Sequence, residues 1–160
     1  MSIELVKSFL SAKGLGDRVM EFEVSSATVE LAAAALGTEG ARIAKSLTFY
    51  GKEGECLLIV TAGDQKIDNA KFKAFFGTKA KMMSAEDALA ATGHAVGGVC
   101  PFALPDGVKV YADISMQRFD IVYPAAGSAN SAVRLTCAEL FEASGALEWI
   151  DVCKPRETIL

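Results

Sequence analysis

The chain has 160 residues, of which 51% are hydrophobic and 22% are charged, and its formal net charge is −4. This length allows one domain with a buried core, and the composition excludes a disordered chain. Proteins that bind long stretches of nucleic acid are usually basic, because neutralised phosphates supply much of the affinity. The acidic balance therefore excludes extensive nucleic-acid contacts, and a nucleic-acid partner would contact only a small area.

The N-terminus and the cysteines bear on where the protein is found. The chain carries charges at Glu4 and Lys7, where a signal peptide would be apolar. No apolar run approaches the ~20 residues that a membrane-spanning helix needs. The four cysteines are scattered and form no CxxC pair, which is typical of reduced thiols. We expect a cytoplasmic protein with no membrane and no DNA partner.

The N-terminal part alternates helices with strands. The apolar spacing predicts a helix over residues 2–13, and the alternation of residues 19–24 predicts a strand. Thr28 can cap a short alanine-rich helix. Strands over 43–50 and 56–61 then flank a glycine-containing hairpin turn, and the second is apolar on both faces, as a buried central strand is.

Two further helices are predicted in the middle of the chain. Asp68 can cap the first, and Gly77 can end it. Ser84 and Asp87 resemble a capping box for the second, which ends at Gly93. Three phenylalanines share one face of the first helix and are predicted to lie in the core. They are Phe72, Phe75 and Phe76.

Short strands dominate the last third, where Thr136 and Glu139 form a capping box for one more helix. Hairpin-like pairs of strands with helices between them favour an α/β fold with a mixed, partly antiparallel sheet over a Rossmann array. No repeat or linker interrupts the chain, so residues 1–160 are expected to form a single domain. The strands predicted here cover residues 95–99, 108–113, 121–123, 133–135 and 147–152.

Lysines concentrate between residues 66 and 81, where Asp68 is the only acidic residue. Such a segment is either a solvated face or a patch that contacts phosphates, and the sequence leaves both interpretations open. The five lysines are Lys66, Lys71, Lys73, Lys79 and Lys81.

Several kinds of active site are excluded by the sequence. Neither GxGxxG nor GxxxxGK[ST] occurs, which removes the main support for a nucleotide cofactor. His94 is the only histidine, so a multi-histidine metal site cannot form. A nucleophile–histidine pair could use only His94, with Cys100 nearby in the sequence, or His94 could simply line a pocket rim.

The segment around Gly97 and Gly98 is a second candidate. Glycine allows a left-handed backbone and the close approach of a ligand, and amides held there can stabilise an oxyanion. Pro101 would stiffen the end of the segment. The alternative is an ordinary turn.

Lys45 lies within an otherwise apolar strand. A lysine in this context must reach solvent, pair with a carboxylate or face a polar cleft. Asp113, at the end of a later strand, either pairs with Lys45 or starts the following turn.

Taken in order, these segments resemble the YbaK/ProX family of aminoacyl-tRNA deacylases, which are similar to the editing domain of bacterial-type prolyl-tRNA synthetases. The resemblance runs from about residue 21 to residue 152 and rests on the order of the segments. The matching segments are Thr28-Val29-Glu30, Lys45-Ser46-Leu47, Thr92-Gly93, the run from Gly97 to Phe102, Asp113, and the run from Tyr123 to Gly127.

The resemblance implies a curved, barrel-like sheet and hydrolysis of the ester that joins an amino acid to the terminal adenosine of tRNA, without a cofactor or a side-chain nucleophile. Lys45 matches the essential lysine that holds the substrate, and Gly97-Gly98 matches the loop whose backbone contacts the ester. Water activation is attributed to the substrate's own ribose hydroxyl or cysteinyl thiol. The implied pocket residues are Thr92, His94, Val99, Cys100, Pro101, Phe102, Asp113, Gly127 and Ser128, and some relatives carry histidine or arginine where Ser128 stands.

The implied partner is the 3′ end of a mischarged aminoacyl-tRNA, such as Cys-tRNA(Pro) or another ester of a small amino acid. A prolyl-tRNA synthetase in a ternary complex is a further candidate partner. Two alternatives stay open at this point: a non-catalytic module that binds tRNA ends or a synthetase, and a hydrolase that depends on Cys100.

Overall fold

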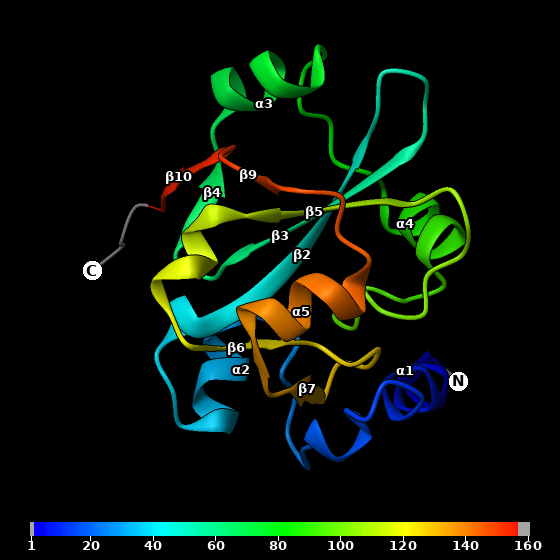
Figure 1. The fold of residues 1–160 in the computed structure, drawn as a ribbon, viewed down its shortest axis with the longest axis vertical. Helices are drawn as coiled ribbons and strands as arrows, with labels where there is room; N and C mark the ends of the chain where they lie inside the picture. The colour runs from blue at the N-terminus through cyan, green and yellow to red at the C-terminus, as the bar shows by residue number, and fades with distance from the viewer. Residues whose placement is uncertain (1, 157–160) are drawn as a thin grey trace.

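The computed structural model describes residues 2–156. Its main feature is a six-stranded mixed sheet that curls into a half-barrel, with the strand order β8-β6-β2-β3-β5-β9 (Figure 1). β2 and β3 are antiparallel, whereas β5 runs parallel to β3 and β6 runs parallel to β2. The predicted mixed, partly antiparallel, curved sheet is therefore confirmed. The strands are β2 (Ile43–Tyr50), β3 (Cys56–Ala62), β5 (Lys109–Asp113), β6 (Ile121–Pro124), β8 (Leu135–Thr136) and β9 (Trp149–Ile150).

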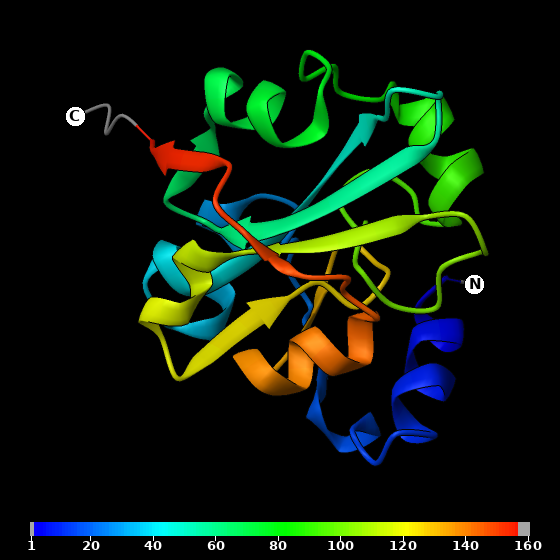
Figure 2. The ribbon, with the colours of Figure 1, turned by 45° about the horizontal axis from the view of Figure 1, so that its top comes forward.

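Two small antiparallel sheets lie beside the main one. In the first, β1 (Val19–Glu21) pairs with β7 (Ser131–Val133). In the second, β4 (Gln65–Ile67) pairs with β10 (Cys153–Pro155), next to α3 in both views (Figures 1 and 2). β4 and β10 were not predicted, because each has three residues and their pairing joins segments that are far apart in the sequence.

Five short α-helices surround the sheets, and α1 and α3 lie at opposite ends of the molecule (Figure 1). The predicted caps are present: Thr28, Asp68, Ser84 and Thr136 each accept a backbone N–H at a helix start. The longest of the described helices has ten residues, and none within residues 2–156 has the length and apolar character needed to cross a membrane. The helices are α1 (Ser2–Ser11), α2 (Val29–Leu36), α3 (Asn69–Phe76), α4 (Ala85–Thr92) and α5 (Cys137–Ser144).

The local predictions were wrong in three places. The predicted strand over 133–135 is interrupted at Arg134, where β7 ends and β8 begins in another sheet. Residues 95–99 form an irregular loop and not a strand. The reason is that Gly97 adopts a left-handed conformation with φ 89°, which interrupts an extended chain. At the start of α4, Ser84 forms its half of the capping box, but the carboxylate of Asp87 accepts a hydrogen bond from the hydroxyl of Tyr50.

The core lies on both faces of β3, every residue of which is buried. This confirms the interpretation of residues 56–61 as a central strand. Phe72 is fully buried and Phe76 packs against the same cluster. Phe75, however, is 44% exposed, and its ring contacts Phe76 and Tyr111 edge-on, so the prediction that all three phenylalanines are core was wrong for Phe75.

Candidate active site

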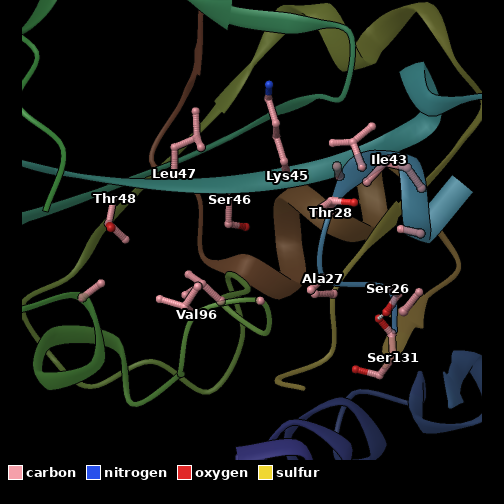
Figure 3. A pocket seen from close by; sticks show the side chains of 18 of the residues that line it. Ser26, Ala27, Thr28, Ile43, Lys45, Ser46, Leu47, Thr48, Val96 and Ser131 are labelled. Carbon is pink, nitrogen blue, oxygen red and sulfur yellow. Dashed lines mark hydrogen bonds between the residues drawn. The ribbon is translucent and has the colours of Figure 1, made fainter. Parts of the chain in front are cut away.

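A cavity of about 280 Å³ opens beside β2. Its walls come from the chain before and within α2, from β2, from the segment that leads into α4, from the loop after α4, and from β6 and β7 (Figure 3). Most of the lining is small and apolar, and it contains no carboxylate. Six hydroxyl-bearing residues interrupt the apolar surface, namely Ser26, Thr28, Ser46, Thr48, Tyr123 and Ser131.

The free edge of β2 gives this cavity its polar wall. β2 pairs with β6 only at Ile43 and Ala44. Further along the same edge, the Thr48 carbonyl accepts from the Met83 amide, and the Tyr50 amide donates to the Lys81 carbonyl. Backbone groups of alternate residues point to the same side of a strand. The amide and carbonyl of Ser46 therefore point to the cavity side, in the gap between these two pairings.

The side chain of Ser46 adds a third polar group to this gap. Its Oγ is buried and has no hydrogen-bond partner among residues 2–156. An unpaired buried hydroxyl costs about 1–3 kcal/mol of folding free energy. Such a group is available to a ligand that enters the cavity. Figure 3 shows Ser46 and Thr48 on one face of β2 and Lys45 and Leu47 on the other.

Lys45 lines the cavity from the other face of the strand. Its Nζ donates to the carbonyl oxygen of Gln65 in β4. Burial, followed by the neighbouring charge of Arg156, lowers the pKa of the Lys45 ammonium below its ordinary value. Lys45 is thus a half-buried cation that no carboxylate neutralises by direct contact within the described residues.

Asp113 is not the partner of Lys45, and that alternative was wrong. Its carboxylate is 1% exposed and accepts from the amides of Ser115 and Val152, each at 3.0 Å. Asp113 caps the 3₁₀ turn Ile114–Arg118 and ties β9 to β5. It does not line the cavity, and its role in this fold is structural.

His94 and Cys100 do come together, with 3.5 Å between Nε2 and Sγ. Both are almost fully buried beneath the loop and neither lines the cavity. Burial raises the pKa of the Cys100 thiol to about 12 and lowers the pKa of His94. The imidazole also contacts the Phe102 carbonyl oxygen at 2.8 Å through Nε2 and the hydroxyl of Ser2 through Nδ1. A protonated thiol is a weak nucleophile, so this geometry does not favour a Cys–His mechanism.

Of the other residues that the resemblance implied, some line the cavity and some are buried behind the loop. Gly97 and Val99 line the cavity. Gly98 does not, because it packs against the backbone of Gly127 and Ser128, where an added Cβ would lie 2.7 Å from the Ser128 nitrogen. Thr92, Pro101 and Phe102 are buried behind the loop.

The chain as a whole can now be compared with known proteins. The model of the aminoacyl-tRNA editing domain family matches residues 23–143. The chain belongs to this family. The protein YwhH of Bacillus subtilis, which is uncharacterised, is 50% identical over 98% of this chain and 100% of its own length. The proline–tRNA ligase of Pelobacter propionicus is 34% identical over 86 residues, which span 53% of this chain and 15% of the ligase.

Two solved structures of similar sequence have the same fold. A protein described as a candidate trans-editing enzyme for prolyl tRNA synthetase has a TM-score of 0.86 and 30% identity, covering 96% of this chain and 97% of its own. The hypothetical protein APE2540 has a TM-score of 0.84 and 30% identity, covering 94% and 99%. The editing-domain fold is therefore shared over nearly the whole length of these chains.

Sequence reasoning missed part of the cavity wall of this editing domain. Ser46 was noted only as a neighbour of Lys45, because the absence of a partner for its hydroxyl is visible only in three dimensions. Val96 and Met82 also line the cavity and are 69% and 59% exposed. The sequence carried no signal for them, because the exposure of these two apolar side chains is visible only in the structure. No group of three metal-binding side chains is found in the part of the chain that the structure describes.

Proposed function

We propose that the protein hydrolyses the ester bond of mischarged aminoacyl-tRNA in trans, releasing the free amino acid and the tRNA. The observation that carries this proposal is the cavity beside β2 in a chain of the editing family. Lys45 and Ser46 both line this cavity, from opposite faces of the strand. We place the activity in the cytoplasm, where charged tRNA is used.

The amino acid that enters the cavity is small and uncharged. A volume of about 280 Å³ must hold the aminoacyl group and part of the terminal nucleotide. A charged side chain would lose its hydration against alanine, valine and methionine side chains, with no carboxylate in the lining to pair a cation. Cysteine, alanine, serine and threonine fit this description, and Cys-tRNA(Pro) is the first substrate to test.

The residues of the site divide the work on the substrate. The carbonyl and hydroxyl oxygens of Ser46 accept hydrogen bonds from the α-ammonium group that every aminoacyl ester carries. The Lys45 ammonium holds the terminal nucleotide and the ester carbonyl, where negative charge develops as water attacks. The backbone of the Gly97-Gly98 loop faces the same carbonyl at Gly97, which lines the cavity, while Gly98 holds the loop against Ser128. The substrate's neighbouring ribose hydroxyl takes the proton of the attacking water as it gives its own proton to the leaving ribose oxygen. In a cysteinyl ester the substrate's thiolate takes the proton of the water and passes it to the leaving ribose oxygen, so that the free amino acid and the tRNA hydroxyl are the products.

The tRNA partner is proposed to be tRNA(Pro). This rests on the match to part of a proline–tRNA ligase and on the structural neighbour described for prolyl tRNA synthetase. A synthetase that hands over the mischarged tRNA in a ternary complex is compatible with a small footprint on the 3′ end.

The test is a deacylation panel on tRNA(Pro) charged with cysteine, alanine, serine, threonine and proline. We expect rapid loss of at least one small non-cognate amino acid and slow loss of proline. The same amino acids on their cognate tRNAs serve as matched controls for tRNA choice. Binding of charged tRNA without any turnover would replace this proposal with the non-catalytic module.

A further inference from the structure

The lysine-rich segment folds into a surface that the proposed chemistry does not use. Within residues 2–156, ion pairs hold Lys7, Lys71 and Lys109. No ion pair is formed by five lysines on and around α3, β4 and β10, which we call the lysine face. They are Lys66, Lys73, Lys79, Lys81 and Lys154.

Two lysines of this face stand directly opposite each other. Lys66 of β4 and Lys154 of β10 are register partners in an antiparallel pair, so their side chains share one face of the small sheet. Like charges in this position destabilise a sheet. Asp68, in the same segment, accepts from the amides of Ala70 and Lys71, caps α3, and forms no ion pair with Lys66 or Lys154. Stability of the fold therefore does not explain the Lys66–Lys154 pair, whereas an anionic ligand would.

The remaining lysines continue the face along α3. Lys73 and Lys79 are exposed and line a shallow hollow together with Asn69, Ala70 and Ala80. The ammonium of Lys81 lies over the ring of Tyr50, 5.4 Å from its centroid. Within residues 2–156, Lys73, Lys79 and Lys81 form no ion pair with a carboxylate.

Both ends of the lysine face meet the cavity. At one end, the Lys45 ammonium contacts the carbonyl of Gln65, the residue before Lys66. At the other end, Lys81 is followed by Met82 and Met83, which line the cavity wall. A ligand whose end occupies the cavity would therefore leave it next to the segments that carry these cations.

We propose that the lysine face binds backbone phosphates of the RNA that adjoins the terminal nucleotide in the cavity. This inference rests on the proposed function and adds the path of the tRNA acceptor end. Lysine is a point charge suited to phosphates, and it is depleted in protein–protein interfaces, where arginine and aromatic residues are enriched. The lysine face itself contains no arginine, and the adjoining Arg156 is paired with Glu30, so this composition favours RNA over an acidic protein. The limited face is also consistent with the net charge of −4.

The test measures binding of uncharged tRNA by fluorescence anisotropy over a series of salt concentrations. The variants are Lys66→Gln with Lys154→Gln, and Lys73→Gln with Lys79→Gln. The matched control is Lys13→Gln with Arg134→Gln, which removes the same charge from residues next to α1 and β7, at the other end of the molecule (Figure 1). All six side chains except Lys66 are exposed, and melting temperatures establish that each variant is folded.

Each lost phosphate contact reduces the slope of log K against log salt concentration by about 0.7–0.9. We expect each lysine-face double variant to lose about 1.5 from the slope and at least about tenfold in affinity at 0.1 M salt, with no change in the control. Slopes equal to that of the control would overturn the proposal. Binding is measured with uncharged tRNA, so it does not depend on deacylation. If the lysine-face variants lose slope relative to wild type but the wild-type protein never deacylates, the proposed function is refuted and the lysine face is kept.

A second readout separates the face from the cavity. An aminoacylated terminal adenosine carries the ester but no RNA chain. The double variants should hydrolyse it at the wild-type rate while their KM for charged tRNA rises. Equal losses on both substrates would mean that the lysines act on the cavity, contrary to the proposal.

Discussion

Lys45 and Ser46 are consecutive residues of β2, yet their side chains leave opposite faces of the strand (Figure 3). The Lys45 ammonium contacts the Gln65 carbonyl, whereas the buried Ser46 hydroxyl has no partner among the described residues. A substrate that contacts both must therefore lie across the free edge of β2. The edge is open only between its pairings with β6 and with the segment before α4. In the function proposed above, this gap is the place where the ester would be bound.

The first prediction concerns the charge of Lys45. Lys45→Ala should lower the single-turnover deacylation rate by at least about 100-fold, because a cation placed at a reacting ester is worth a few kcal/mol and each 1.36 kcal/mol is tenfold in rate. The fold should survive, since the side chain only makes one hydrogen bond to a carbonyl. Lys13→Ala, on an exposed lysine, is the control. A rate within threefold of wild type would remove Lys45 from the mechanism.

The lowered pKa of Lys45 predicts a pH dependence. The required form is the cation, so activity falls as pH rises through the pKa of Lys45, which burial and Arg156 hold below 10.5. Arg156→Gln removes one lowering charge and frees Glu30, whose charge raises the same pKa. The alkaline limb of the rate profile should therefore move to higher pH. The rate with Lys45→Ala at each pH serves as the blank for spontaneous ester hydrolysis and is subtracted. A limb that stays in place or moves down would contradict this assignment.

Ser46→Ala separates function from stability. Removing an unpaired buried hydroxyl relieves its desolvation penalty, so the melting temperature should stay the same or rise. The deacylation rate should fall by up to about tenfold, the equivalent of one lost hydrogen bond to the substrate. Ser8→Ala, at an exposed position of α1, should change neither quantity. A Ser46→Ala protein that is clearly less stable would show that the hydroxyl stabilises the fold. A fully active Ser46→Ala protein would show that the hydroxyl does not contact the substrate.

The predictions from the sequence were correct where the determinants are local. Thr28, Asp68 and Thr136 cap helices within three residues of themselves, and the hairpin turn sits between two strongly apolar strands. The loop at 95–99 was mistaken for a strand because the left-handed φ that Gly97 takes is not fixed by the sequence, which equally allows an extended glycine, and because Gly98 packs on the backbone of Ser128, some 30 residues away in the sequence.

The same distinction applies to the site. Lys45 could be predicted because a lysine in an apolar strand is unusual in the sequence itself. Ser46 could not, since serine is common in strands and only the gap between two pairings leaves its polar groups unpaired. His94 and Cys100 were predicted as rim residues, but they are buried because the loop folds over them.

The buried thiol gives a prediction that tests the Cys-dependent alternative. Cys100→Ala should keep most of the deacylation activity, because a thiol with a pKa of about 12 carries almost no thiolate near neutral pH. Iodoacetamide should modify Cys100 slowly in the native protein, as mass spectrometry of a time course can establish. The half-buried Cys137 provides the internal comparison. Loss of activity with a normal melting temperature would restore the Cys–His mechanism.

The two glycines of the loop should respond differently to substitution. At Gly98 an added Cβ would lie 2.7–2.8 Å from backbone atoms of Gly127 and Ser128, which cannot rotate away. Gly98→Ala should therefore cost about 1–3 kcal/mol of stability, which is roughly 2–12 °C in melting temperature for a chain of this size. At Gly97 the closest atoms to an added Cβ would be the Cβ atoms of Ala27 and Ala129, at 3.1 and 3.3 Å, in a left-handed backbone.

Gly107→Ala is the matched control for Gly97→Ala, since Gly107 has a similar φ and open space around its Cβ position. The two variants should lose similar stability, about 1–2 kcal/mol from the left-handed backbone. Only Gly97→Ala should also slow deacylation, measured at a temperature well below that at which the variant melts, because Gly97 lines the cavity and Gly107 does not. Single-turnover rates and melting temperatures are measured on all three variants. If Gly98→Ala is as stable as wild type, its contact with Ser128 does not shape the loop, and if Gly97→Ala is fully active, the loop does not contact the substrate.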